Sequence, residues 1–309
     1  MINPELLAAS AGNAVAILAY GGMGTRKTNA IHTLPPPILV FDMEQGIASL
    51  LPWLRRRKRW DETKWTEYTQ AQREDYFARL NPEVLEYCKT QTRVLPAGYI
   101  DVVYFDPLVH DAYTELAAAI ANFPCAEYNS GVIDSAQEFS QLTQSKVKGS
   151  GQELEPMVLR NWAGAQERAA IGFRKLKNYR DRGVFIYITC SEEIQKDYVD
   201  DPRSTPSGST PPEPYSVKGT MSVPGQLANR VPHFLDIIVH ARIINGAPTW
   251  VVKPEALPAR GAHWESKDRF GRLPDYVAPN FRQIFGHIYG DDGRKTIYAA
   301  ARSLLEPAN

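Results

Sequence analysis

A glycine-rich segment near the N-terminus has the residue types needed to hold a nucleotide phosphate. Residues 21–28 read Gly-Gly-Met-Gly-Thr-Arg-Lys-Thr and follow an apolar run. Glycines let backbone N–H groups point at phosphate oxygens, Lys27 suits the β- and γ-phosphates, and the Thr28 hydroxyl suits Mg²⁺. A helix after the segment would add the positive end of its dipole. The nucleotide-binding residues that we expect are Gly22, Met23, Gly24, Thr25, Arg26, Lys27 and Thr28.

Arg26 departs from the phosphate-loop pattern, which has a glycine at this position. If the backbone there must adopt a glycine-like conformation, arginine costs on the order of 1 kcal/mol or more. If the position is already helical, the arginine is tolerated and its side chain points outward or toward the nucleotide. The alternative for the whole segment is a plain turn between a strand and a helix. Nucleotide binding is therefore the firmer expectation, and hydrolysis the weaker one.

Carboxylates follow two further apolar runs. Asp134 ends the run 131–134, which is where an ATPase places the acid that holds magnesium through water. Glu44 follows the run 38–41, at a position suited to a carboxylate that orients the attacking water. The alternatives are a helix cap for Asp134 and a solvated loop for Glu44.

The elements that must position these residues alternate between strands and helices. Short apolar runs separated by helical segments predict an α/β fold with a mostly parallel central sheet flanked by helices. Two later runs, 234–241 and 249–252, are expected to form antiparallel strands. The other predicted strands are 14–20, 38–41, 99–105, 131–135 and 184–189, and the predicted helices are 27–33, 112–122 and 160–182.

We expect a single domain over residues 1–309 with two departures from regular alternation. Residues 51–95 are charged and aromatic, and we interpret them as a helical insert on the surface. Residues 200–222 are rich in proline, serine and threonine, and this composition predicts a mobile loop. Residues 146–151 are short and rich in glycine and serine, and we expect them to be a second mobile loop, in which Lys146 and Lys148 could contact nucleic-acid phosphates.

Overall composition restricts the partners and the location. Lysine plus arginine and aspartate plus glutamate both number 35, so binding to nucleic acid would need a local basic surface. Three widely spaced cysteines argue against a zinc site or a disulfide framework. The apolar run 14–20 is far shorter than the roughly 20 residues that span a bilayer. We therefore expect a soluble intracellular protein without a membrane partner.

Taken in order, these motifs resemble the RecA-like P-loop ATPases encoded by bacteriophages, including those described as single-strand annealing proteins. The resemblance implies a RecA-like core that binds and hydrolyses ATP with Mg²⁺. It also implies a homo-oligomer, either a ring or a filament, that acts on single-stranded DNA in phage recombination, annealing or replication in the host cytoplasm. The segments that carry the resemblance are 21–28, 38–46, 132–135, 186–189, 231–236 and 267–271.

The resemblance also implies roles for individual residues. Glu44 matches the water-activating glutamate of an Asp-x-Glu strand end, and Asp134 matches the magnesium-binding acid. Lys267 and Arg269 match a Lys-x-Arg-x-Gly motif that, in DnaB-type helicases, reaches into the nucleotide of the neighbouring subunit. The alternative for this last motif is an exposed basic turn.

Three functions remain open at this point. The first is an oligomeric recombination or annealing ATPase that acts on single-stranded DNA. The second is another motor on the same core, such as a helicase or a DNA-packaging ATPase. The third is a scaffold that binds nucleotide without turnover, in which Arg26 and the insert serve protein contacts.

Overall fold

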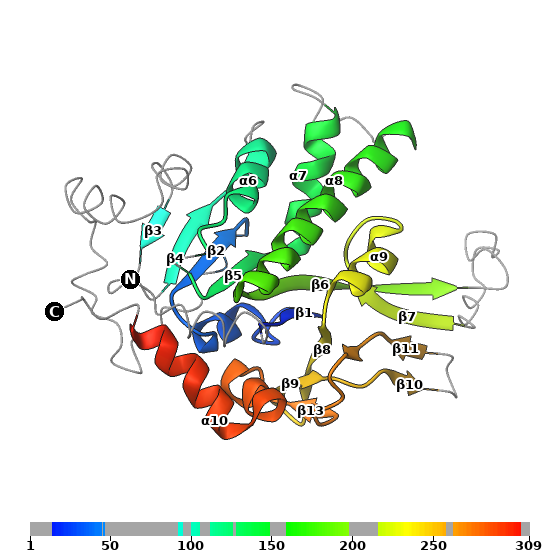
Figure 1. Ribbon diagram of the computed structural model, residues 1–309. Coiled ribbons are helices and arrows are strands. Elements are labelled where there is room, and N and C mark those ends of the chain that lie inside the picture. Colours follow the sequence, from blue (N-terminus) through cyan, green and yellow to red (C-terminus); the bar gives the residue numbers. More distant parts are fainter. Residues whose placement is uncertain are drawn as a thin grey trace.

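A mixed and mostly parallel β-sheet forms the centre of the molecule (Figure 1). Six strands run parallel in the order β8-β1-β6-β5-β2-β4. Their bounds are β1 Ala16–Gly21, β2 Ile38–Asp42, β4 Ile100–Tyr104, β5 Ser130–Asp134, β6 Phe185–Asp197 and β8 Ile237–Ile244. The computed structural model describes residues 14–44, 46, 92–94, 100–105, 112–125, 128–148, 159–197, 216–257 and 262–303.

Antiparallel strands border this parallel region. β3 (Thr92–Val94) pairs with β4 at one edge. At the other edge β9 (Ala247–Val251) pairs with β8, and β13 (Tyr276–Val277) pairs with β9. β12 (Lys267–Asp268) also pairs with β8, near the first residues of that strand. The predicted α/β fold with a mostly parallel sheet is therefore confirmed.

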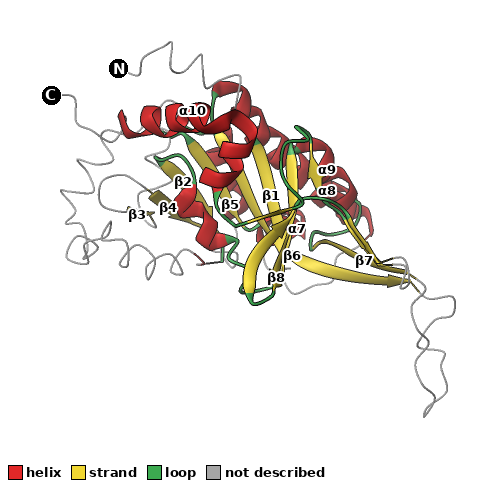
Figure 2. Ribbon diagram, turned by 90° about the horizontal axis from the view of Figure 1, so that it is seen from below, coloured by secondary structure: helices red, strands yellow, loops and turns green. Residues whose placement is uncertain are grey.

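Helices cover both faces of the sheet, because alternate residues of each buried strand point to opposite sides. In β1, Leu18 and Tyr20 face one apolar core while Ile17 and Ala19 face the other. Figures 1 and 2 show most helices on one side and α10 across the other. The first group is α6 Ala112–Ala121, α7 Ala136–Lys148, α8 Leu159–Asn178, the 3₁₀-helix η4 Tyr179–Arg182 and α9 Leu227–Phe234. The second is the 3₁₀-helix η1 Thr28–Thr33 and α10 Phe281–Ser303.

β6 extends past the central sheet and forms an arm (Figure 2). Its second half pairs antiparallel with β7 (Ser216–Met221). β7 pairs in parallel with β11 (Ala262–Trp264), which pairs with β10 (Glu255–Leu257). The arm therefore starts at the same edge of the sheet as the segment that follows β1.

Two predicted boundaries are wrong. The loop expected over 200–222 is shorter, because residues 216–221 form β7. The last proline of the segment is Pro214, so the composition that predicted a loop ends just before this strand. In the insert predicted over 51–95, residues 92–94 form a strand instead of a helix. The rest of the insert and residues 200–215 lie outside the described residues.

Three further predictions need correction. β8 is parallel to its central neighbour β1 and antiparallel to β9 and β12, whereas we expected antiparallel pairing alone. Lys146 and Lys148 belong to the last turn of α7 instead of a loop. The helix expected after the glycine-rich segment is the six-residue η1. Because so few peptide dipoles are aligned in a helix of this length, the partial positive charge at its N-terminus, which would attract a phosphate, is small.

Within the described residues, no helix combines the length and the apolar character that crossing a bilayer requires.

Candidate functional site

The glycine-rich segment leaves the sheet at the carboxyl end of β1. Gly21 is paired on both sides, with Ser191 of β6 and with Ala241 of β8. A Cβ at Gly21 would lie 2.1 Å from the Ala241 carbonyl oxygen, so only glycine fits there. Met23 at the tip is 99% exposed. In parallel sheets, ligands bind outside the carboxyl ends of the strands, and the segment lies at this edge.

Lys27 folds back over the segment. Its ammonium donates hydrogen bonds to the carbonyl oxygens of Gly21 at 2.7 Å and Gly22 at 2.8 Å. Burial lowers the pKa of Lys27, while the charges of Asp134 and Glu44 oppose this shift. The positive charge is therefore held inside the loop by carbonyl oxygens, for which phosphate oxygens could substitute.

The backbone conformation at Arg26 decides whether this position is glycine-like or helical. Its φ angle is +62°, in the left-handed region that favours glycine. The position is therefore glycine-like and not helical. A non-glycine residue in this region costs roughly 1–2 kcal/mol, so the arginine is a local source of strain at the loop.

We expect Arg26→Gly to raise the thermal stability of the protein. Relief of the left-handed backbone, less the entropy that glycine adds to the unfolded chain, leaves a net gain of about 0.5–1 kcal/mol. This corresponds to an increase of about 1–3 °C in the unfolding temperature. Arg26→Ala is the matched control, because alanine removes the side chain but keeps the strain. A similar increase for both variants would show that the side chain, and not the backbone, is the cause.

Asp134 lies buried at the end of β5 and faces the segment. Its Oδ2 accepts a hydrogen bond from the Thr28 hydroxyl at 3.0 Å, and its Oδ1 accepts one from the Thr189 hydroxyl of β6. Burial raises the pKa of Asp134 to about 6, and the nearby Asp42 and Glu44 carboxylates add to this, while the two hydroxyl bonds act against it. Strand ends thus bring together a threonine and an acid that lie far apart in the sequence.

Glu44 lies in the turn after β2 and is fixed by its surroundings. Its Oε1 accepts a hydrogen bond from the Ser135 hydroxyl. Asp42 Oδ1 accepts the backbone N–H groups of Glu44 at 3.1 Å and Gly46 at 3.2 Å. The Met43 N–H donates to the Asp134 carbonyl oxygen at 2.8 Å. The turn therefore holds the Glu44 carboxylate beside the end of β5.

The Thr28 and Asp134 side chains suit a magnesium ion that also binds phosphate. Mg²⁺ prefers oxygen ligands and is commonly held by one or two carboxylates together with substrate phosphates. Among the described residues, no group of three or more His, Cys, Asp or Glu side chains could hold a metal ion unaided. Gly46 packs here, since an added Cβ would lie 3.0 Å from Asp134 Oδ2 and 3.5 Å from Thr28 Oγ1. The donor set therefore fits an ion that arrives with a nucleotide.

A second polar group connects the arm to the central sheet beside the segment. Glu192 of β6 accepts a hydrogen bond from Trp264 Nε1 at 2.8 Å, and its Oε1 lies 3.1 Å from His240 Nε2. The ring of His240 stacks between Tyr20 and Trp264, with centroid distances of 5.0 and 5.8 Å. Tyr20 directly precedes Gly21, so this stack fixes the root of the arm next to the glycine-rich segment.

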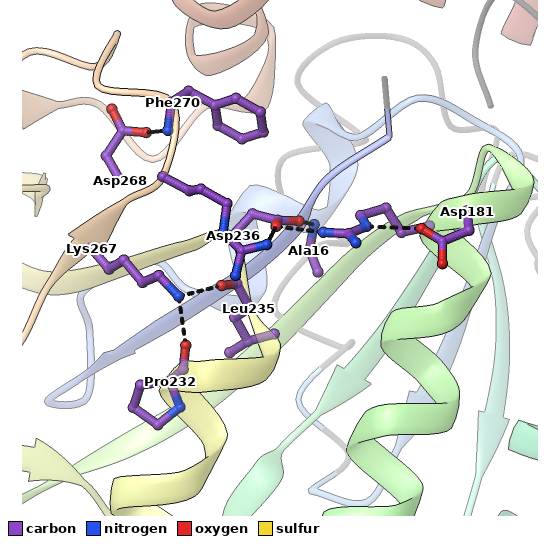
Figure 3. Close-up of polar contacts among 10 residues, drawn as sticks. Ala16, Asp181, Pro232, Leu235, Asp236, Lys267, Asp268 and Phe270 are labelled. Carbon is purple, nitrogen blue, oxygen red and sulfur yellow. Dashed lines mark hydrogen bonds and ion pairs between the residues drawn. The ribbon is translucent and has the colours of Figure 1, made fainter. Parts of the chain in front are cut away.

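In their own chain, Lys267 and Arg269 contact the residues around the start of β8 and not the glycine-rich segment. Figure 3 shows the contacts of Lys267. The Lys267 ammonium donates to the carbonyl oxygens of Pro232 and Leu235, both at 2.8 Å. Arg269 Nη1 forms an ion pair with Asp236 Oδ1 at 2.9 Å. Asp236 Oδ2 in turn accepts the N–H of Ala16, the first residue of β1, at 3.0 Å. The length of β1, about 16 Å, separates this group from Gly21, so a role at a neighbouring subunit's nucleotide stays a prediction.

The Asp236 group includes two functional candidates that sequence reasoning missed. Arg180 Nη1 also forms an ion pair with Asp236 Oδ1, at 2.5 Å. Arg180 and Asp236 are 56 residues apart, and no local pattern joins them. The one available signal was an acid directly before the buried strand that starts at Ile237, where an unpaired carboxylate would be costly.

No protein-family model matches this chain, and no curated protein matches its sequence.

Proposed function

We propose that this chain is a RecA-like P-loop ATPase that binds ATP with Mg²⁺ and works as a homo-oligomer on single-stranded DNA. The observation that carries the proposal is the 3.0 Å hydrogen bond from the Thr28 hydroxyl to Asp134 Oδ2. A magnesium ion bound to the phosphates of a nucleotide needs this pair of oxygen ligands, one from the loop and one from a nearby strand. The strand order supports the proposal. β6 lies between β1 and β5, so the glycine-rich segment after β1 and Asp134 at the end of β5 lie at the same edge of the sheet, one strand apart.

Each polar side chain at this edge then has a role. Lys27 binds the β- and γ-phosphates, and Thr28 and Asp134 hold the magnesium ion. When bound, this ion neutralises charge on the phosphates and orients them for displacement. Glu44 orients the attacking water and accepts its proton. Because Ser135 donates to the same carboxylate, it keeps Glu44 aimed at the site before nucleotide binds.

A scaffold that binds nucleotide without turnover is the second candidate, and Arg26 is the observation that favours it. Its side chain is exposed and its backbone occupies a glycine-like conformation inside the loop. A bulky cation there adds a further charge beside the phosphates, where it would strengthen binding of the ground state as well as the transition state. Such uniform binding raises affinity without raising kcat.

Measuring ATP turnover with and without single-stranded DNA, with the oligomeric state recorded in parallel, separates these candidates. We expect turnover that single-stranded DNA stimulates and that Glu44→Gln abolishes while ATP binding is kept. Glutamine is the replacement of choice, because it preserves the shape of the side chain and can still form hydrogen bonds, but it cannot accept a proton. Tight binding without turnover would favour the scaffold. Stimulation by duplex DNA with strand separation or translocation would favour another motor.

A further inference from the structure

Asp236 is a buried carboxylate shared by two arginines (Figure 3). Its Oδ1 accepts hydrogen bonds from both Arg180 and Arg269, at 2.5 and 2.9 Å. Its Oδ2 accepts the Ala16 N–H, and its side chain is only 1% exposed. Asp236 is therefore held in place by β1, and its negative charge is paired with the positive charges of both arginines.

The two arginines are not equivalent. Arg180 is 20% exposed and forms a second ion pair, with Asp181 at 3.3 Å. The Arg269 side chain is 46% exposed, and among the described residues its ion pair is with Asp236 alone. If Arg269 left, Asp236 would keep Arg180 and the Ala16 N–H, so no buried charge would be left unpaired. Arg180 is thus the fixed partner, and Arg269 is the detachable one.

The backbone on both sides of Arg269 is fixed, so release would involve the side chain alone. The Arg269 N–H donates to the Asp236 carbonyl oxygen at 3.0 Å, and Lys267 is anchored on Pro232 and Leu235. The Asp268 carboxylate accepts the N–H groups of Phe270, Arg272 and Leu273, each at 2.9 Å. Side-chain rotation within a fixed backbone is fast and needs no movement of the loop.

We propose that Asp236 and Arg180 form a latch that holds the Arg269 guanidinium in its own subunit and releases it to a stronger anion, the nucleotide phosphates of a neighbouring subunit. Arg180 is the positioning residue of the latch, because it satisfies Asp236 whenever Arg269 leaves. The identity of the anion rests on the proposed ATPase function, whereas the exchange at Asp236 does not. The latch would keep Arg269 out of action in a subunit that has no neighbour.

The test uses the full-length chain and phenylglyoxal, a reagent that modifies free guanidinium groups, with the modified peptides quantified by mass spectrometry. Without Arg180, Arg269 becomes the one described arginine that pairs with a buried acid, so Arg180→Gln should slow modification of Arg269 about tenfold. Asp236→Asn should instead accelerate it. Arg230, which pairs with Glu167 on the surface, provides an internal standard in every sample. Equal rates at Arg269 in the wild type and in both variants would overturn the latch.

Turnover provides the second readout. Arg180→Gln should lower kcat about tenfold with KM for ATP unchanged, and should cause no further loss in an Arg269→Ala background. Arg180→Gln combined with Asp236→Asn frees Arg269 again and should restore kcat, whereas simple damage to the fold predicts a further loss. Losses from Arg180→Gln and Arg269→Ala that multiply would overturn the functional part. Absence of turnover in the wild type would refute the proposed ATPase, and the modification rates would still decide the latch.

Discussion

Lys27→Ala is expected to reduce ATP affinity by about 100- to 1,000-fold. In the structure the ammonium is held within the loop by the Gly21 and Gly22 carbonyl oxygens. Bound phosphate would replace these acceptors with charged oxygens, and each hydrogen bond between charged groups contributes about 1.5–3 kcal/mol. Loss of two such bonds, each near the lower end of this range, costs about 3–4 kcal/mol and gives the predicted reduction, since each 1.4 kcal/mol is tenfold in affinity. Equilibrium binding of a fluorescent ATP analogue in the presence of Mg²⁺ would measure the change.

Lys175→Ala is the matched control for this variant. Lys175 lies on the exposed face of α8, so its loss removes the same charge without touching the loop. We expect its ATP affinity to equal that of the wild type. Far-ultraviolet circular dichroism of both variants would show that the fold is kept. If Lys27→Ala bound ATP as tightly as Lys175→Ala, the glycine-rich segment would not be the phosphate site.

Asp134→Asn is expected to lower turnover strongly and to stabilise the protein without ligand. Loss of the carboxylate that we propose as a magnesium ligand should lower turnover by about 100- to 1,000-fold, because a bound metal contributes several kcal/mol to charge stabilisation. Stability should change in the opposite direction, because burial holds the pKa of Asp134 near 6 against an ordinary value of 3.8. At 1.36 kcal/mol per unit, ionised Asp134 costs up to about 3 kcal/mol at pH 8.

The stability difference between Asp134→Asn and the wild type should depend on pH, in a direction that the pKa of Asp134 determines. A carboxyl group whose pKa is raised by folding favours the folded state at acid pH, and that stability is lost as pH rises from about 4 through about 6. The advantage of Asp134→Asn over the wild type should therefore be small at pH 4 and reach its maximum above pH 7. Urea unfolding at each pH measures the difference. Asp292→Asn, at a fully exposed acid, should show no such dependence of its stability difference on pH.

The parallel sheet and the polar cluster at its edge follow from local patterns in the sequence. Apolar runs that end in glycine or acid predict strands, and parallel strands place their carboxyl ends at one edge. Thr28, Glu44 and Asp134 each follow or end such a run, and the structure brings Thr28 into contact with Asp134 and places Glu44 beside it. Their proximity could be predicted from the strand directions alone, because a βαβ connection makes the two strands parallel.

Other features depend on contacts that sequence patterns do not encode. The backbone at Arg26 is left-handed, whereas the sequence pattern left a glycine-like and a helical conformation open at this position. Arg269 meets Asp236, 33 residues away, only because β12 pairs beside the start of β8. The strand 216–221 forms on a partner, the extended β6. In each case tertiary pairing decided a local conformation.

The continuity of β6 restricts where the length of this chain can change. β6 is a 13-residue strand, about 40 Å long, that carries Thr189 at the Asp134 carboxylate and Glu192 at the root of the arm. Because side chains alternate along a strand, deletion of one residue between these two positions would turn every later side chain to the opposite face. Insertions and deletions in the connection between β6 and β7 leave both strands in register. Gene variants of this protein should therefore differ in length at that connection, and keep a constant spacing between Thr189 and Glu192.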